Sequence, residues 1–209
     1  MASLVSETIL GILASGRGSN MQAICSSIDA GQLHAKVGVV ISDKTNAKVL
    51  EHAAARGIPA VCIERKSFAS KQEFEAAIAR QLTLYHVKLV VLAGFMRILS
   101  TDFVTFFSGS IMNIHPSLLP AFPGLGAHEQ AIAYGAKVSG CTIHFVDEGM
   151  DTGPIIMQQA VTIHADDTVE SLSERILAVE HELYPQAIRL YCEQRLCIEG
   201  RNVKIISNK

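Results

Sequence analysis

The chain has 209 residues, of which 49% are hydrophobic and 18% are charged, and its formal net charge is −2. This composition provides a sizeable core, and the near-neutral charge, without a long basic or acidic run, gives no indication of an electrostatic surface for nucleic acid or membranes. Residues 1–8 lack a basic start followed by a long apolar region, and no apolar run reaches the roughly 18 residues needed to span a membrane. We therefore expect a single domain, 1–209, that is cytoplasmic and has small molecules as partners.

The first hundred residues alternate short apolar runs with segments of helical periodicity. The run 89–93 is apolar throughout, as in parallel strands that are buried on both faces. This alternation indicates βαβ units and an α/β fold with a Rossmann-like, open, mostly parallel sheet covered by helices on both faces. We expect strands at 9–14, 36–42, 60–63 and 89–93, and helices at 21–30, 47–56 and 68–86.

The second half of the chain adds further strands that lead into polar segments. Ile111 and Met112 begin a short run that ends at Pro116, a pattern that predicts a buried strand followed by a rigid turn. A second strand leads into the Asp- and Gly-rich segment 147–153, so we expect the ends of these two strands to converge. The expected elements are a short helix at 128–134, strands at 141–146 and 155–163, a long helix at 168–193 and a hairpin at 196–206 that turns at Gly200.

Three polar side chains at these strand ends suit chemistry on an acyl group. The amide of Asn113 can donate hydrogen bonds to an oxyanion, which lowers a barrier by about 3–4 kcal/mol. His115 can move protons near neutral pH, and Asp151 beside it would favour its charged form and fix its tautomer. The alternative is that His115 caps a strand end and Asp151 binds backbone amides in a turn.

The loop from Ser15 to Asn20 stands between the first predicted strand and the first predicted helix. Free amides at a helix N-terminus can hold a phosphate, and glycines let the backbone approach it. The loop lacks the Gly-Lys-Ser/Thr ending of a nucleotide P-loop and the third glycine of a dinucleotide fingerprint. A tight turn in which Ser19 or Asn20 caps the helix is the alternative.

The segment from Gly94 to Leu99 follows the fourth predicted strand and so lies at the carboxyl edge of the sheet, where open α/β proteins bind ligands. Its backbone could contact a flat heterocycle, or its apolar side chains could pack while Arg97 is solvated. The five cysteines are scattered without a Cys-x-x-Cys pair, and the histidines have no ligand-like spacing. No metal site is predicted.

Several motifs stand in the same order as in one known enzyme family. Two of them carry the candidate catalytic residues: MNIHPSLLPAFPGLGAHEQAI and GCTIHFVDEGMDTGPIIMQ. The others are GILASGRGSNMQAI near the start, LVVLAGFMRIL in the middle and EHELYP near the end. Across nearly its whole length, the chain resembles the folate-dependent phosphoribosylglycinamide formyltransferases of purine synthesis.

The resemblance implies the formyltransferase fold and transfer of a formyl group from 10-formyltetrahydrofolate to the amino group of 5′-phosphoribosylglycinamide. It implies a phosphate-binding half, 1–100, and a folate-binding and catalytic half, 101–209. His115, Asn113 and Asp151 would be catalytic, with Asn113 and a protonated His115 stabilising the oxyanion. The ribonucleotide would contact Gly18, Ser19, Asn20 and Glu180, and the folate would contact Lys71, Met96, Arg97, Ile98, Leu99, Asn113, Asp147, Glu148, Gly149, Met150 and Asp151.

Three alternatives remain open from the sequence. A formyltetrahydrofolate deformylase resembles this core but normally carries an extra N-terminal domain, for which we expect no room in 209 residues. A nicotinamide-dependent oxidoreductase would use Gly16 and Gly18 at the pyrophosphate and Asp43 on a ribose, and its incomplete fingerprint counts against it. A protein that only binds a phosphorylated metabolite would be stabilised by the ligand without turnover.

Overall fold

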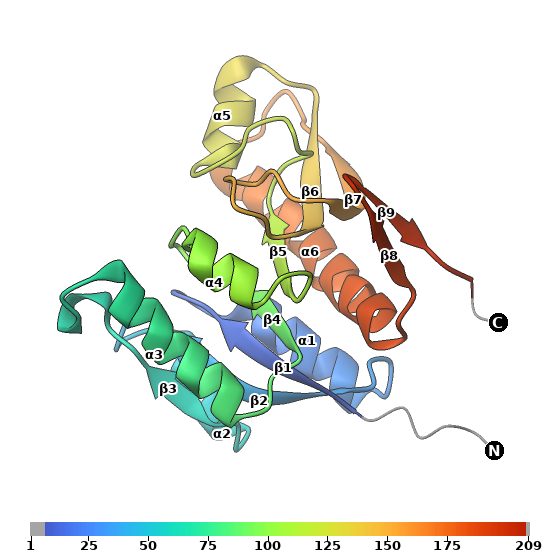
Figure 1. Ribbon diagram of the computed structural model, residues 1–209. Helices are drawn as coiled ribbons and strands as arrows, with labels where there is room; N and C mark the ends of the chain where they lie inside the picture. Colours follow the sequence, from blue (N-terminus) through green and yellow to red (C-terminus); the bar gives the residue numbers. More distant parts are fainter. Residues whose placement is uncertain (1–6, 208–209) are drawn as a thin grey trace.

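Nine strands join into one sheet in the order β3-β2-β1-β4-β5-β6-β7-β9-β8 in the computed structural model, which describes residues 7–207 (Figure 1). The strands are β1 Thr8–Leu13, β2 Ala35–Ser42, β3 Ala60–Cys62, β4 Leu89–Leu92, β5 Ile111–His115, β6 Val138–Phe145, β7 Ile155–Thr162, β8 Leu196–Glu199 and β9 Asn202–Ile205. The helices are α1 Ser19–Asp29, α2 Lys48–Ala55, α3 Lys71–Leu84, α4 Thr101–Phe106, α5 Ala127–Tyr134 and α6 Val169–Cys192, with a 3₁₀ turn, η1, at Arg65–Ser67.

Strands β1 to β5 pair in parallel, and β6 then pairs antiparallel with both β5 and β7. The strand order reverses beside β1, since the chain first adds β2 and β3 on one side and then β4 and β5 on the other. Open α/β sheets bind ligands in the crevice that such a reversal leaves at the carboxyl ends of the strands. This architecture confirms the predicted Rossmann-like α/β class.

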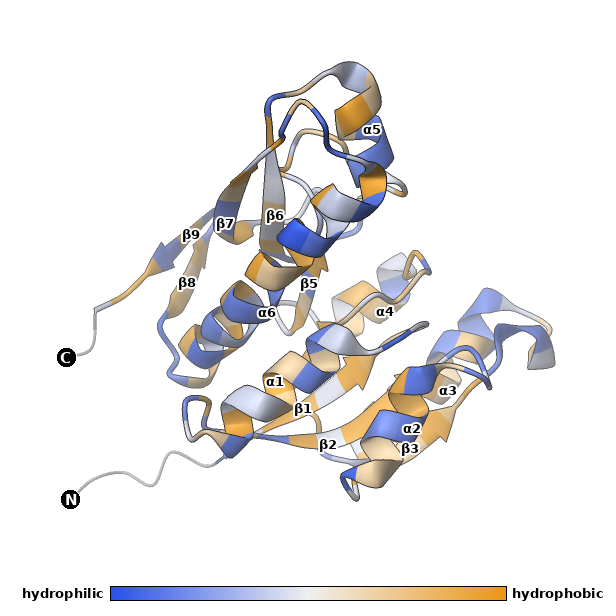
Figure 2. Cartoon of the chain, turned by 180° about the vertical axis from the view of Figure 1, so that it is seen from behind, coloured by the Kyte–Doolittle hydropathy of each residue, from blue (hydrophilic) through white to orange (hydrophobic). Residues whose placement is uncertain are grey.

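The helices cover both faces of the parallel part of the sheet. Helices α3 and α4 lie on the face nearer the viewer in Figure 1, and α1, α2 and α6 lie on the opposite face, which Figure 2 shows from behind. Strand β4 serves both layers, because Leu89 and Val91 join the cluster under α1 and α6 whereas Val90 and Leu92 join the cluster under α3. This two-sided burial explains why the strand is apolar at every position.

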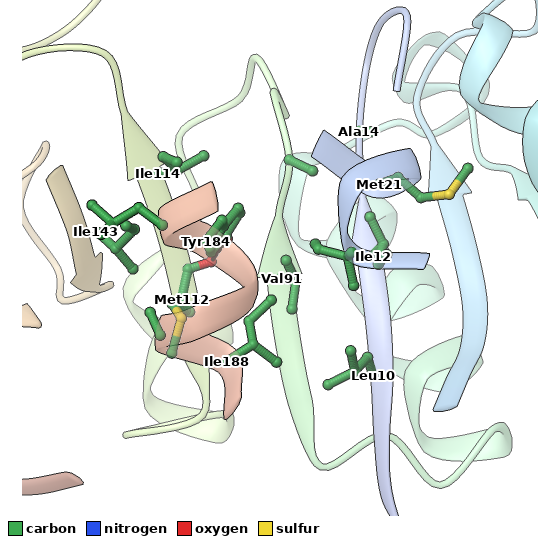
Figure 3. Close-up of a cluster of buried hydrophobic side chains, with 14 of the residues drawn as sticks. Leu10, Ile12, Ala14, Met21, Val91, Met112, Ile114, Ile143, Tyr184 and Ile188 are labelled. Carbon is green, nitrogen blue, oxygen red and sulfur yellow. Dashed lines mark hydrogen bonds between the residues drawn. The ribbon is translucent and has the colours of Figure 1, made fainter. Parts of the chain in front are cut away.

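Helix α6 is the longest in the structure and packs across the middle of the sheet. Thr168 begins it with a capping box, accepting a hydrogen bond from the Ser171 amide at 3.2 Å while Ser171 Oγ accepts one from the Thr168 amide at 3.0 Å. Tyr184 and Ile188 project from it into the core beside Met112 (Figure 3). The Tyr184 hydroxyl lies 3.0 Å from the Leu92 carbonyl oxygen and 2.9 Å from that of Met112.

Most predicted elements match the observed ones to within one or two residues, and the differences have local causes. The helix expected at 68–86 begins only at Lys71, because the Ser70 hydroxyl caps it by accepting from the Glu73 amide at 3.1 Å. Helix α4 was not predicted, since six residues are too few to display a helical period. The prediction that the ends of these two strands converge was wrong. Strand β6 runs antiparallel to β5, so Phe145 at the end of β6 pairs with Met112 near the start of β5.

Within residues 7–207, no helix is both long enough and apolar enough to cross a membrane.

The two tyrosines of α6 allow a matched test of the contacts that hold this helix on the sheet. We expect Tyr184→Phe to lower the free energy of unfolding by about 1–3 kcal/mol, because it removes a fully buried hydroxyl shared by two strand carbonyls. Thermal denaturation followed by circular dichroism measures this change.

Tyr191→Phe is the control. Its hydroxyl makes the same kind of contact near the start of β4, 3.1 Å from the Lys88 carbonyl oxygen, but in a partly exposed place. We expect a change below about 1 kcal/mol there, since water can replace the lost partner. Equal losses in the two variants would contradict the stabilising role given to the buried hydroxyl.

Candidate active site

Alternation along β5 places Asn113 and His115 on the sheet face opposite α6. Met112 and Ile114 belong to the cluster under α6, so the residues between and after them point the other way. Strand β6 alternates in the same manner, and its register sets His144 directly opposite Asn113 and Thr142 opposite His115. Four polar side chains therefore gather on one face of two neighbouring strands.

Asp151 lies beside His115, as the sequence predicted. Its carboxylate oxygen Oδ2 is 3.4 Å from His115 Nδ1 and accepts a hydrogen bond from the Gly124 amide at 2.8 Å. His115 Nε2 lies 2.8 Å from the Phe122 carbonyl oxygen. Nε2 therefore carries a hydrogen, because the Phe122 carbonyl can only accept, and a second proton would sit on Nδ1 beside the Asp151 carboxylate.

His144 completes this group and was not among the predicted site residues. Its Nδ1 lies 2.8 Å from the Phe145 carbonyl oxygen, which can only accept, so Nδ1 carries the hydrogen and Nε2 is free to accept. Asn113 Nδ2 lies 3.2 Å from that Nε2, and Asp151 Oδ1 lies 3.8 Å from it. Burial lowers the pKa of His144, which favours this neutral form.

The alternation of β6 could have pointed to His144, because apolar Cys141, Ile143 and Phe145 alternate with Thr142 and His144. What the sequence lacked was the pairing that sets this strand against β5. The register of β6 and β7 also shifts between Ile143 and His144, and such irregularities commonly redirect side chains next to active sites.

The segment after β5 is pinned to the sheet by buried polar contacts. Thr142 Oγ1 donates to the Ser117 carbonyl oxygen at 2.6 Å and accepts from the Leu119 amide at 3.0 Å. Gln158 Nε2 donates to Thr142 Oγ1 and to the Leu119 carbonyl oxygen, both at 2.9 Å. These contacts fix the start of the connection that carries Phe122 and Gly124 to His115 and Asp151.

The predicted phosphate loop has the expected shape. Gly18 stands at the N-cap of α1 with φ 80°, and a Cβ there would meet Val49 Cγ2 at 2.6 Å, so both conformation and space require glycine. The first intrahelical bond joins the Gln22 amide to the Gly18 carbonyl at 3.0 Å. The amides of Ser19 and Asn20 therefore have no acceptor inside the helix and point out of its N-terminus.

Asn20 and Glu180, which were predicted to contact the same ligand, lie together in the structure. Asn20 Nδ2 donates to Glu180 Oε2 at 2.8 Å, and both side chains are buried between α1 and α6. Burial raises the pKa of Glu180, and the hydrogen bond from Asn20 partly opposes that rise. The Oδ1 atom of Asn20 is buried without a hydrogen-bond partner.

The segment 94–99 is fastened to its neighbours at the carboxyl edge of the sheet. The Met96 amide donates to Ser15 Oγ at 3.0 Å, and Arg97 Nε donates to the buried Asp43 at 2.6 Å. The side chains of Met96 and Ile98 are 63% and 61% exposed, whereas Leu99 is buried in the core. Leu99 can thus offer only its backbone to a ligand at this edge.

The pairing of Arg97 with Asp43 bears on two alternatives from the sequence. Arg97 is not simply solvated, since its guanidinium also lies 5.8 Å from the centroid of the Phe74 ring. Asp43, which the oxidoreductase alternative needs on a ribose, is instead occupied by Arg97.

Lys71 begins α3 close to the same edge. Its Nζ lies 3.8 Å from Glu75 Oε1, and that oxygen accepts from the Ser100 amide at 2.9 Å while Glu75 Oε2 accepts from the Ser100 hydroxyl. The Lys71 side chain is 42% exposed beside its ion pair with the buried Glu75. Over residues 7–207, no three His, Cys, Asp or Glu side chains cluster in a way that could hold a metal ion.

Comparison with known proteins gives a consistent result. Residues 10–188 match the model of the family described as formyl transferase. The chain is 47% identical over 178 residues to phosphoribosylglycinamide formyltransferase of Bacillus subtilis, covering 85% of this chain and 91% of that protein. It is 44% identical to part of the human trifunctional purine biosynthetic protein adenosine-3, covering 93% of this chain and 19% of that protein. The crystal structure of glycinamide ribonucleotide transformylase 1 from Symbiobacterium toebii superposes with a TM-score of 0.95 at 50% identity, covering 96% of this chain and 95% of that one.

The buried carboxylate between α1 and α6 makes a stability prediction with a definite sign. Because the pKa of Glu180 is raised in the folded protein, its neutral form is favoured there, and the stability that this form contributes is lost as the pH rises through the raised value. We expect Glu180→Gln to melt at a higher temperature than the original protein at pH 8, with the difference shrinking as the pH falls toward 4.5.

Differential scanning calorimetry without ligand, repeated across this pH range, measures the effect. Glu182→Gln is the matched control, since Glu182 is exposed on the same helix and should change the melting temperature little at any pH. A lower melting temperature for Glu180→Gln at pH 8 would show that the ionised carboxylate is favourable in its place.

Proposed function

The chain belongs to the formyl transferase family, and we propose that it transfers a formyl group from 10-formyltetrahydrofolate to the amino group of 5′-phosphoribosylglycinamide in purine synthesis. The names of relatives 47% and 50% identical over most of their length support this reaction. The observation that carries the proposal is the group formed by Asn113, His115, His144 and Asp151 on one face of β5 and β6.

The reaction requires a new C–N bond between the amine of the ribonucleotide and the formyl carbon. Attack by the neutral amine turns the formyl oxygen into an oxyanion, which Asn113 and a protonated His115 stabilise as hydrogen-bond donors. The bond from the formyl carbon to the folate nitrogen then breaks. The proton lost by the amine reaches that nitrogen through His115 or through water held by Asp151, so charge and atoms balance.

His144 has a supporting role in this mechanism. By accepting one N–H of Asn113, it fixes which end of the amide is the nitrogen and leaves the second N–H for the oxyanion. A neutral His144 is needed for this, and burial favours that form.

The ribonucleotide binds along the side of the crevice formed by α1 and α6. Its phosphate accepts hydrogen bonds from the amides of Gly18, Ser19 and Asn20, where the helix dipole also favours an anion. The carboxylate of Glu180 accepts hydrogen bonds from the ribose hydroxyls, close to the Asn20 side chain that holds it in place.

The folate binds as the second substrate on the other side of the crevice. Its pterin lies against the backbone of 96–99 and the loop 147–151, where the exposed side chains of Met96, Ile98 and Met150 offer apolar surface. The partly exposed Lys71 would supply a positive charge to the folate. Both substrates are soluble metabolites, in keeping with a cytoplasmic enzyme whose partners are small molecules.

The experiment that tests the function is a spectrophotometric assay of the purified protein with 10-formyltetrahydrofolate or its dideaza analogue, with and without the ribonucleotide. We expect loss of the formyl group from the folate only when the ribonucleotide is present, together with formylated ribonucleotide. Release of formate without an acceptor would instead identify a hydrolase. Absence of any turnover would favour the nicotinamide-dependent oxidoreductase or the protein that only binds a phosphorylated metabolite.

Asp151→Asn tests the proposed proton transfer. The amide oxygen can still accept from Gly124, so the loop should keep its position, but the charge beside His115 is lost. We expect kcat to fall by about 10²- to 10⁴-fold, the usual contribution of general acid–base groups. The Kd of the ribonucleotide, measured by isothermal titration calorimetry, should stay within about twofold.

Asp102→Asn serves as the control for loss of one surface carboxylate, since Asp102 is exposed on α4. It should leave kcat and the Kd unchanged. A kcat near that of the original protein in Asp151→Asn would remove Asp151 from the mechanism.

A further inference from the structure

In the loop 147–153, hydrogen bonds to the side chain of Asp147 form a short bridge between residues before and after Asp151. Asp147 Oδ1 accepts from the Gly149 amide at 3.1 Å and from the Thr152 hydroxyl at 2.7 Å. At its base, the loop is closed by the Phe145 amide, which donates to the Pro154 carbonyl at 2.9 Å. The bridge therefore joins the first residue of the loop to the residue directly after Asp151.

Glycines on both sides allow this bridge to form. A Cβ at Gly149 would lie 2.0 Å from Thr152 Oγ1, and a Cβ at Gly153 would lie 1.8 Å from the Phe145 carbonyl oxygen. A side chain at Gly149 would displace the Thr152 hydroxyl, and one at Gly153 would require the backbone to move. The Thr152 hydroxyl therefore lies close against Gly149 while it donates to Asp147.

Asp151 has a backbone conformation that needs such support. Its φ is 54°, in the left-handed region, which costs a residue other than glycine about 1–2 kcal/mol. Its carboxylate must nevertheless point at Gly124 and His115, which belong to a different part of the chain. A contact within the loop has to hold the backbone in this conformation while the side chain reaches across.

We propose that Asp147 and Thr152 form a clip that positions Asp151 for the reaction, an inference that rests on the proposed function. They act as positioning residues, because their hydrogen bond joins the loop to itself and, of these three residues, Asp151 is the one that lies against His115. Both side chains are at the protein surface, so the bond adds little to global stability. Its effect is local, on the direction of one carboxylate.

The substitutions Thr152→Val and Thr152→Ser test the clip as a matched pair. Valine keeps the shape of threonine but has no hydroxyl, whereas serine keeps the hydroxyl. We expect kcat to fall about 10-fold in Thr152→Val, because small displacements of catalytic groups are costly, and to stay near the original value in Thr152→Ser. The KM values for both substrates and the melting temperature should change little in either variant.

Asp147→Ala and the double variant Asp147→Ala/Thr152→Val then test whether the two residues act together. We expect the double variant to be no slower than the slower single variant, because one bond can be lost only once. Multiplicative losses would overturn the proposal, as would equal rates for the valine and serine variants. A rise in the folate KM with unchanged kcat in Asp147→Ala would assign Asp147 to folate contact instead.

A readout without turnover separates this inference from the proposed function. The Gly124 amide donates to Asp151, so its hydrogen exchange, followed by nuclear magnetic resonance, reports whether the carboxylate stays in place. We expect faster exchange of this amide in Thr152→Val than in Thr152→Ser. If the original protein transfers no formyl group but this difference appears, the proposed function fails and the clip stands; equal exchange in an active enzyme would overturn only the clip.

Discussion

The antiparallel register of β5 and β6 is the constraint on which the candidate site depends. Met112 and Ile114 are buried under α6, and this burial forces Asn113 and His115 to the other face. A slip of one residue would put the two polar side chains under α6 and move the two apolar ones to the face of the candidate site. The hydrophobic core thus selects the register, and the register in turn sets His144 against Asn113.

Buried hydrogen bonds to carboxyl groups tie the rim of the crevice together in a way that apolar packing does not. Asp43 pairs with Arg97, and Glu180 is held by Asn20, so each buried carboxylate has a partner from a distant segment of the chain. A buried carboxyl group that lost its partner in these places would be costly, which makes the relative position of the segments specific. A few polar contacts therefore position the segments at the carboxyl edge, in addition to the packing of the hydrophobic core.

The sequence predicts local structure well because the relevant signals are local. Continuous apolar runs such as 89–93 identify strands buried on both faces, and their spacing identifies the parallel βαβ units. Helix α4 escaped prediction because its six residues show no period, and its Ser100 cap alone is a weak signal.

The site was predictable only in part, and for a different reason. Motifs pointed to Asn113, His115 and Asp151, and the structure brings these residues together. His144 was missed because its position opposite Asn113 depends on the pairing of strands about thirty residues apart, which the alternation within β6 alone does not give. His144 and Asn113 are in direct contact although they lie far apart along the chain.

The loop that carries Asp151 positions a side chain of the candidate site but contributes nothing to the hydrophobic core that stabilises the fold. The left-handed backbone of Asp151 would suit glycine better, but glycine has no carboxylate to place beside His115. The strain at this position follows from the requirement for a charged side chain, and the neighbouring Gly149 and Gly153 provide the space that the strained turn needs. Since the loop adds no residue to the two core clusters, its sequence is free to satisfy the geometry of the site alone.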